Sequence, residues 1–133
     1  MRSALFCLAL LASAGCGPSA PTVVNDSEDP EVYAKYVKQI VYNMSESVPR
    51  SGEPWAVIGN LVDELENPSR PQGNYAGIYQ QLLTVAKEIQ KDSQKAGGRP
   101  GNLGSRLAEL KKIADGLPGE VKAFKSGRSG PND

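Results

Sequence analysis

The sequence predicts an all-α fold, an antiparallel helical bundle of about four helices over residues 29–126. Apolar residues recur at spacings of three and four in four successive stretches, which is typical of amphipathic helices. Proline, glycine and asparagine separate these stretches and leave short connections, so we expect neighbouring helices to run in opposite directions. A three-helix domain with one peripheral helix is the alternative arrangement.

The first helix is expected to begin at Pro30, because Asp29 is a good N-cap and proline is favoured at the first helical position. Glu31 follows at the positive end of the helix dipole. Pro49 ends the stretch. The residues expected to face the core are Val32, Tyr36, Val37, Ile40, Val41, Met44 and Val48.

The second helix is expected to follow Ser51 and to start near Pro54, by the same pairing of a capping residue with a proline. Gly59 lies inside it and costs about 1 kcal/mol relative to alanine, so we expect it to mark a close helix crossing. Asn67-Pro68 ends the helix. Its expected buried face comprises Trp55, Ile58, Leu61, Val62 and Leu65.

The third helix is expected after a turn-rich connection, residues 68–74, with Asn74 as its cap. Ala96-Gly97-Gly98, with Pro100 shortly after, is a strong helix end. The residues of its core stripe are Tyr75, Ile78, Tyr79, Leu82, Ala86 and Ile89.

A fourth helix is expected after Asn102 or Ser105, either of which can cap it, and Gly116 and Pro118 close it. Its core stripe comprises Leu103, Leu107, Leu110, Ala114 and Leu117. Residues 127–133 are small and polar, and we expect a disordered tail there.

The N-terminal residues 1–15 are expected to be a secretory signal peptide. A short basic start precedes an uninterrupted apolar run over residues 4–12, and small residues follow it. That run is too short for a permanent membrane-spanning helix, which needs about 20 apolar residues. Residues 16–28 are rich in glycine, proline, serine and acids, a composition that predicts a flexible tether.

Ser13-Ala14-Gly15-Cys16 resembles the lipobox of bacterial lipoproteins, although Ser13 stands where leucine is usual. The resemblance implies that Cys16 receives a diacylglycerol, becomes the new N-terminus and anchors the chain to a bacterial membrane. The domain would then lie in the periplasm or outside the cell, and the choice between inner and outer membrane stays open. Ala12-Ser13-Ala14 also fits ordinary signal peptidase, whose cleavage after Ala14 would leave Cys16 a free thiol.

The composition argues against several classes of site. The 15 basic and 15 acidic residues balance, which gives no reason to expect a nucleic-acid partner. Histidine is absent, and with it the commonest metal ligand and general base, so we expect no metal, no cofactor and no catalytic activity. Asp63, Glu64 and Glu66 are interpreted as a solvated helix end, with a catalytic carboxylate pair as the minor alternative.

We therefore expect a membrane-anchored bacterial envelope lipoprotein whose helical domain is structural or binds an envelope protein. The alternative is a tethered binder of a small ligand or envelope polymer, through a tyrosine-lined groove and a basic face. The candidate contact residues are Tyr33 and Tyr42, expected at the edges of the core, and Lys87, Lys91 and Lys95, spaced four apart.

Charge is unevenly distributed along the chain. Residues 16–83 carry a net charge of −5 and residues 84–128 a net charge of +5. One interpretation is that the acidic first half pairs with the basic second half inside the bundle. The other is a basic face that meets anionic lipid or an envelope polymer.

Overall fold

The computed structural model describes residues 28–123, which form four α-helices and two short 3₁₀ turns and contain no strand. The helices are α1 (Pro30–Ser47), α2 (Pro54–Glu66), α3 (Ala76–Ala96) and α4 (Leu103–Ala114), and the turns are η1 (Val48–Arg50) and η2 (Gly73–Tyr75). The expected signal peptide, Cys16, the tether up to residue 27 and the tail at residues 127–133 lie outside the described residues.

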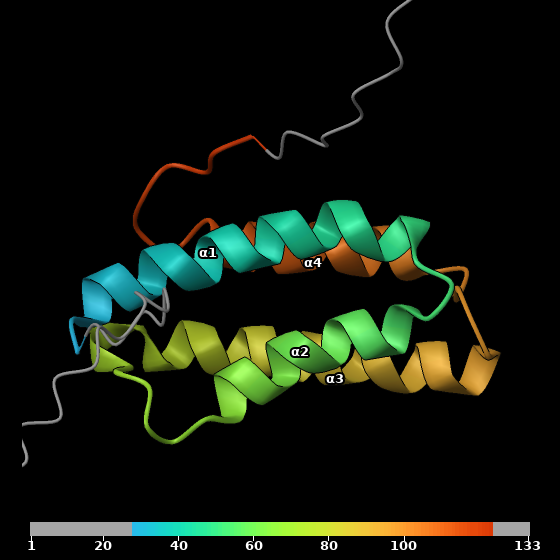
Figure 1. The fold of residues 1–133 in the computed structure, drawn as a ribbon, viewed down its shortest axis with the longest axis horizontal. Helices are drawn as coiled ribbons and strands as arrows, with labels where there is room; N and C mark the ends of the chain where they lie inside the picture. Colours follow the sequence, from blue (N-terminus) through green and yellow to red (C-terminus); the bar gives the residue numbers. More distant parts are fainter. Residues whose placement is uncertain (1–27, 124–133) are drawn as a thin grey trace, which may run out of the picture.

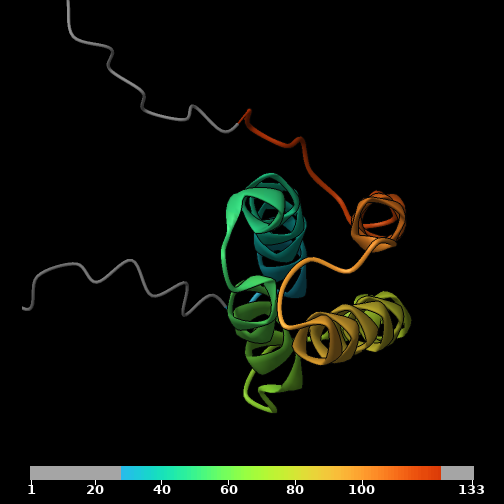
Figure 2. The same cartoon turned by 90° about the vertical axis from the view of Figure 1, so that its right-hand side faces the viewer.

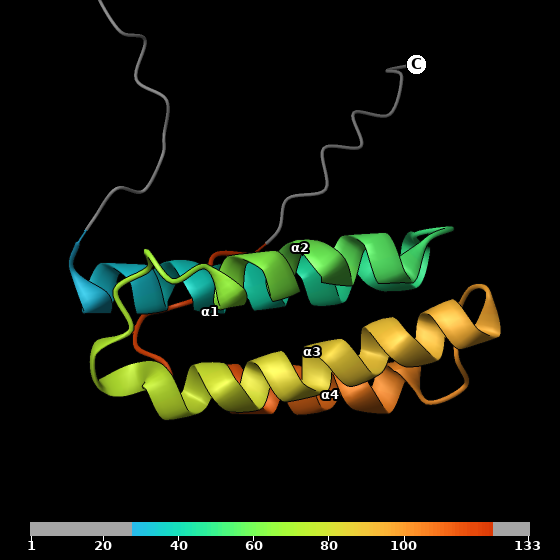
Figure 3. The same cartoon turned by 90° about the horizontal axis from the view of Figure 1, so that it is seen from below.

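The four helices form one antiparallel bundle, which confirms the predicted fold class. Figure 1 shows successive helices running in opposite directions. Seen end on, they occupy the corners of a square in the order α1, α2, α3, α4, with α4 beside α1 (Figure 2). Figure 3 shows the same bundle as two layers, α1 with α2 and α3 with α4. No helix is peripheral, because each packs on two neighbours.

The first helix begins as predicted, whereas the third and fourth begin differently. Asp29 accepts a hydrogen bond from the Glu31 amide at 2.8 Å and caps α1. Asn74 caps nothing: it lies within η2, and α3 starts at Ala76 without a side-chain cap. Asn102 directly precedes α4, but its side chain donates to Asp92 at 3.3 Å instead of capping the helix.

The end of α3 is fixed by the predicted glycine pair. Gly97 adopts a left-handed conformation, with φ of 64°. Its amide donates to the Gln94 carbonyl, and the Gly98 amide donates to the Ser93 carbonyl. These two bonds make a Schellman motif, which satisfies carbonyls that the helix leaves without partners. The chain then turns through residues 97–102 into α4.

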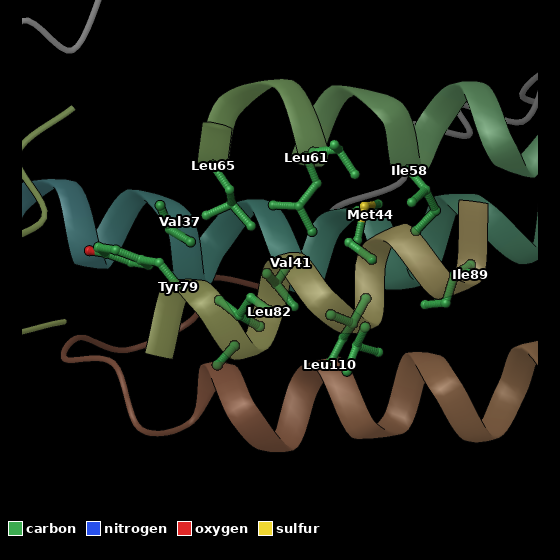
Figure 4. Packing of buried hydrophobic residues seen from close by; sticks show 14 of the residues in the cluster. Val37, Val41, Met44, Ile58, Leu61, Leu65, Tyr79, Leu82, Ile89 and Leu110 are labelled. Atoms are coloured by element: carbon green, nitrogen blue, oxygen red, sulfur yellow. The ribbon is translucent and has the colours of Figure 1, made fainter. Parts of the chain in front are cut away.

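The core lies along the axis of the bundle and takes residues from all four helices. Figure 4 shows these side chains pointing inward; among the labelled ones are Val37, Val41, Ile58, Leu61, Leu82, Ile89 and Leu110. Gly59 lies where α2 approaches α3, since a Cβ there would come within 3.1 Å of Gln90 Nε2. No backbone atom of α3 lies within 4 Å of that Cβ position, so the expectation that Gly59 marks a close helix crossing stays a prediction.

The buried face of α1 differs from the predicted one. Val32 and Tyr36 were expected in the core, but they are 38% and 39% exposed. Tyr33 and Ala34 are buried in their place. The reason is that α1 packs against both α2 and α4, which turns the centre of its buried face toward Ala34 and Val41 and leaves Tyr36 at the outer edge.

Candidate functional site

A groove runs between α1 and α2 on the outer surface of the bundle. It has a volume of about 390 Å³ and is open to solvent. Its lining comprises Tyr36, Ile40, Asn43, Met44 and Ser47 from α1 with Val57, Asn60, Leu61 and Glu64 from α2. The groove exists because α1 packs less extensively on α2 than the other neighbouring helices pack on each other.

Two exposed apolar side chains lie near one end of α1: Tyr36 lines the groove, and Val32 precedes it by one helical turn. Val32 and Tyr36 are the large hydrophobic residues that the described part of the chain leaves exposed. Because they are four residues apart on α1, they lie next to each other on one face of the helix. Ile40 continues this face into the groove as a half-buried residue. An apolar strip of this kind beside a groove is a feature of protein-binding surfaces.

A polar cluster closes the Tyr36 end of the groove. The Tyr33 hydroxyl donates to the Glu64 backbone carbonyl at 3.3 Å. The Glu64 carboxylate pairs with Arg70 twice, Nε to Oε1 at 2.8 Å and Nη2 to Oε2 at 3.2 Å. The Arg70 guanidinium also lies 5.8 Å from the centre of the Tyr33 ring. These contacts hold the connection after α2 against α1.

The electrostatics of this cluster keep its tyrosines protonated. Burial, with the charge of Glu64 as a second cause, raises the pKa of Tyr33 far above its usual value of 10.0. Burial also raises the pKa of Tyr79 to about 12. The hydrogen bond to Glu64 raises the pKa of Arg70. Both hydroxyls therefore stay protonated to a higher pH than an exposed tyrosine would.

The expected position of Tyr33 at the edge of the core is wrong, because the side chain is 2% exposed and its ring packs on Tyr79 at 5.5 Å between centroids. Tyr42 is half-buried at the α1–α4 edge. Its hydroxyl donates to Asp115, and Lys111 Nζ lies 4.9 Å from its ring centre. Of the two candidate tyrosines, Tyr42 alone retains an accessible surface.

The candidate lysines lie on α3, away from Tyr42. Lys87 pairs with Glu66 of α2, while Lys91 and Lys95 are exposed and form no ion pair with a described residue. Because α3 is diagonally opposite α1 in the square, Tyr42 and the three lysines do not form one face (Figure 2). Cys16 lies outside the described residues.

The acidic residues at the end of α2 are separated by their partners. Glu64 faces Arg70, Glu66 faces Lys87 of α3, and Asp63 is exposed. The Glu66–Lys87 pair is one instance of the expected pairing between the acidic and basic halves of the chain. Within residues 28–123 no three potential acidic or cysteine ligands gather to hold a metal ion. None of the helices described here is long and apolar enough to span a membrane.

Comparison with known proteins identifies no similar protein. The chain matches no family model, no curated protein and no solved structure. The site is therefore defined by its own geometry.

Sequence reasoning missed three residues that shape the surface: Tyr36, Arg70 and Gln39, whose side chain forms hydrogen bonds with the backbone of Lys122. Tyr36 follows the apolar period of α1, so periodicity alone places it in the core. Arg70 lies between two prolines in a connection and has no sequence feature that pairs it with Glu64. Gln39 resembles any polar residue on a solvated helix face.

Proposed function

We propose that this protein is a lipid-anchored bacterial envelope protein whose helical bundle binds a partner protein through the α1–α2 groove. The observation that carries the interaction part is the exposed pair Val32 and Tyr36, of which Tyr36 lines the groove. The anchor part rests on the lipobox-like Ser13-Ala14-Gly15-Cys16.

The shape of the groove favours a protein partner. It extends along two helices and has an apolar floor that includes Met44 and Leu61, with polar residues such as Asn60 among its lining. An apolar centre with a polar rim is the usual anatomy of a protein interface. Tyrosine at such a position contributes a large contact area at low entropic cost.

The anchor and the groove fit together geometrically. Each buried CH₂ of a lipid contributes roughly 0.8 kcal/mol, so the two or three acyl chains of a lipoprotein cysteine hold a protein stably on a membrane. A tether over residues 16–28 reaches at most about 45 Å when fully extended. It joins the bundle next to the first turns of α1, which carry Val32 and Tyr36. The Val32 and Tyr36 part of the proposed contact surface therefore lies at the end of the bundle that the tether joins, and the groove extends from there toward the opposite end.

The anchor is tested by the intact mass of the protein purified from bacterial membranes. We expect a chain that begins at Cys16 and carries added lipid, and we expect Cys16→Ser to release the protein from the membrane fraction. An unmodified chain that begins at Gly15 would overturn the anchor.

The groove is tested by replacing Tyr36 with a photo-crosslinking residue in living cells. We expect a discrete protein adduct that Val32→Glu weakens, because Val32 is exposed and its replacement leaves the core intact. Lys91→Glu on α3 is the matched control and should leave the adduct unchanged. A crosslinker placed at Lys91 tests the alternative basic face, and an adduct there without one at residue 36 would overturn the groove proposal.

A further inference from the structure

The segment that follows α4 crosses to α1 and lies along its outer surface (Figure 2). Leu117 is buried, and its carbonyl accepts a hydrogen bond from Lys38 Nζ at 3.1 Å. Gly119 has φ of 93°, and a Cβ there would come within 2.7 Å of Lys35 Cγ. The backbone therefore lies directly on the aliphatic part of Lys35, which requires glycine at this position.

Gln39 then holds the backbone of this segment at two points. The Lys122 amide donates to Gln39 Oε1 at 2.9 Å, and Gln39 Nε2 donates to the Lys122 carbonyl at 3.1 Å. Gln39 Nε2 also donates to Asn43 Oδ1 at 2.8 Å, which orients the amide group. A side-chain amide that pairs with both backbone groups of one residue recognises an extended chain as a neighbouring strand would, without regard to the side chain.

A cavity of about 280 Å³ continues this surface beyond Gln39. It is lined by Tyr42, Asn43, Glu46 and Arg50 on one side and by residues 121–123 on the other. Glu46 and Arg50 are exposed and form no ion pair with a described residue. The hydrogen bond from Tyr42 to Asp115 fixes one wall. This surface can therefore bind a peptide backbone through the Gln39 amide, and it carries an acidic residue, Glu46, and a basic residue, Arg50, nearby.

We propose that the outer face of α1 and η1, from Lys35 to Arg50, is a binding site for an extended peptide segment of a partner protein, and that residues 118–123 occupy it as an internal competitor. The chain's own segment shows which chemistry fits: glycine over Lys35, and at Gln39 a residue with a free backbone N–H. Displacement is feasible because Lys122 and Ala123 are exposed and Val121 is half-buried. This site is separate from the α1–α2 groove, although Asn43 lines both.

The test uses the full chain carrying Lys122→Pro, which removes the amide that donates to Gln39 and leaves the buried Leu117 in place. The probe is a labelled synthetic peptide with the sequence of residues 118–126. We expect it to bind this variant at least about tenfold more tightly than the wild-type chain, where the internal segment competes at an effective concentration of roughly millimolar.

Two controls show whether the probe uses Gln39. Adding Gln39→Ala to the Lys122→Pro chain, or N-methylating the peptide at the position of Lys122, should each weaken binding by about threefold to tenfold or more, because each removes at least one hydrogen bond. Gln94 is an exposed glutamine on α3, and Gln94→Ala should leave the affinity for the peptide unchanged. Failure of the peptide to bind, or binding that does not depend on Gln39, would overturn the proposal.

A second measurement does not depend on the proline variant. In the wild-type chain, Gln39→Ala should speed hydrogen exchange of the Lys122 amide and tryptic cleavage after Lys122, with little change in Tm. Unchanged exchange and cleavage would overturn the proposal. A wild-type dimer that Gln39→Ala dissociates would also overturn it, because the occupant would then be a second copy of this chain.

Discussion

Arg70 and Glu64 face each other across the end of α2 with two contacts, of 2.8 and 3.2 Å, and their side chains are only 23% and 16% exposed. Without a partner, the negative charge of Glu64 would interact unfavourably with the negative end of the α2 helix dipole. The guanidinium offsets that charge and fastens the connection between α2 and α3 to the bundle.

Arg70→Ala should lower the free energy of unfolding by about 1–3 kcal/mol, because it leaves the largely buried Glu64 carboxylate without its cation. Chemical denaturation measures the change. Lys87→Ala is the control, since it breaks a pair with Glu66 whose side chains are about half exposed and should cost at most about 1 kcal/mol. Equal losses from the two variants would contradict a special role for Arg70.

Tyr33→Phe and Tyr79→Phe should change the free energy of unfolding by different amounts, although both tyrosine side chains are 2% exposed. Tyr33 loses a hydrogen bond to the Glu64 carbonyl, so we expect a loss of about 0.5–1.5 kcal/mol. The Tyr79 hydroxyl is buried and has no hydrogen-bond partner among the described residues, so its removal should be neutral or stabilising. Thermal and chemical denaturation of the two variants measure these changes. A larger loss of unfolding free energy for Tyr79→Phe than for Tyr33→Phe would contradict the hydrogen bonding described for the two hydroxyls.

The stability of the bundle should fall at alkaline pH partly through these tyrosines. Burial raises the pKa of Tyr79 from 10.0 to about 12 and that of Tyr33 further, so the folded state favours the protonated hydroxyl. Their contribution is complete below pH 10 and is lost as the pH rises through the folded-state pKa values. Tyr79→Phe should therefore flatten the fall in unfolding free energy between pH 10 and 12. The same slope in wild type and variant would refute the raised pKa.

Two glycines should respond to alanine in opposite directions. Gly59→Ala should raise the free energy of unfolding by about 0.5–1 kcal/mol, because the new methyl group meets only the flexible end of Gln90. Gly73→Ala should lower it by about 1–3 kcal/mol, because Gly73 has φ of 50° and its Cβ would lie 2.6 Å from Pro30 Cβ. Circular dichroism melts compare the two, and a stabilised Gly73→Ala chain would be inconsistent with this packing.

The helices could be predicted from the sequence because proline and glycine act locally. Pro30, Pro54 and Gly97 determine where helices begin or end through their own backbone geometry. The rotation of α1 could not be predicted, since Tyr33 and Tyr36 are both tyrosines beside the same apolar stripe. Tyr33 is buried because it packs on Tyr79 of α3 and lies beside Glu64 and Arg70 at the end of α2, and periodicity within one helix carries no information on those neighbours.

The surface contacts were beyond prediction for a related reason. Gln39 and Lys122 are 83 residues apart, and their hydrogen bonds form only once α4 has returned alongside α1. The bond involves the backbone of Lys122, so no pairing of side-chain types could indicate it. The same holds for Tyr33, whose hydroxyl bonds the backbone of Glu64.

An even number of antiparallel helices returns the chain to the end from which it started. The start of α1 and the end of α4 therefore lie at one end of the bundle, and the turns at 48–53 and 97–102 lie at the other (Figure 1). With α3 spanning 21 residues, the two ends are about 30 Å apart. The turn around Gly97 therefore lies at the end of the bundle opposite the residues that lead to Cys16. Because no residue of 97–102 lines either surface on α1, an insertion in this turn would change the length of the bundle and leave both surfaces intact.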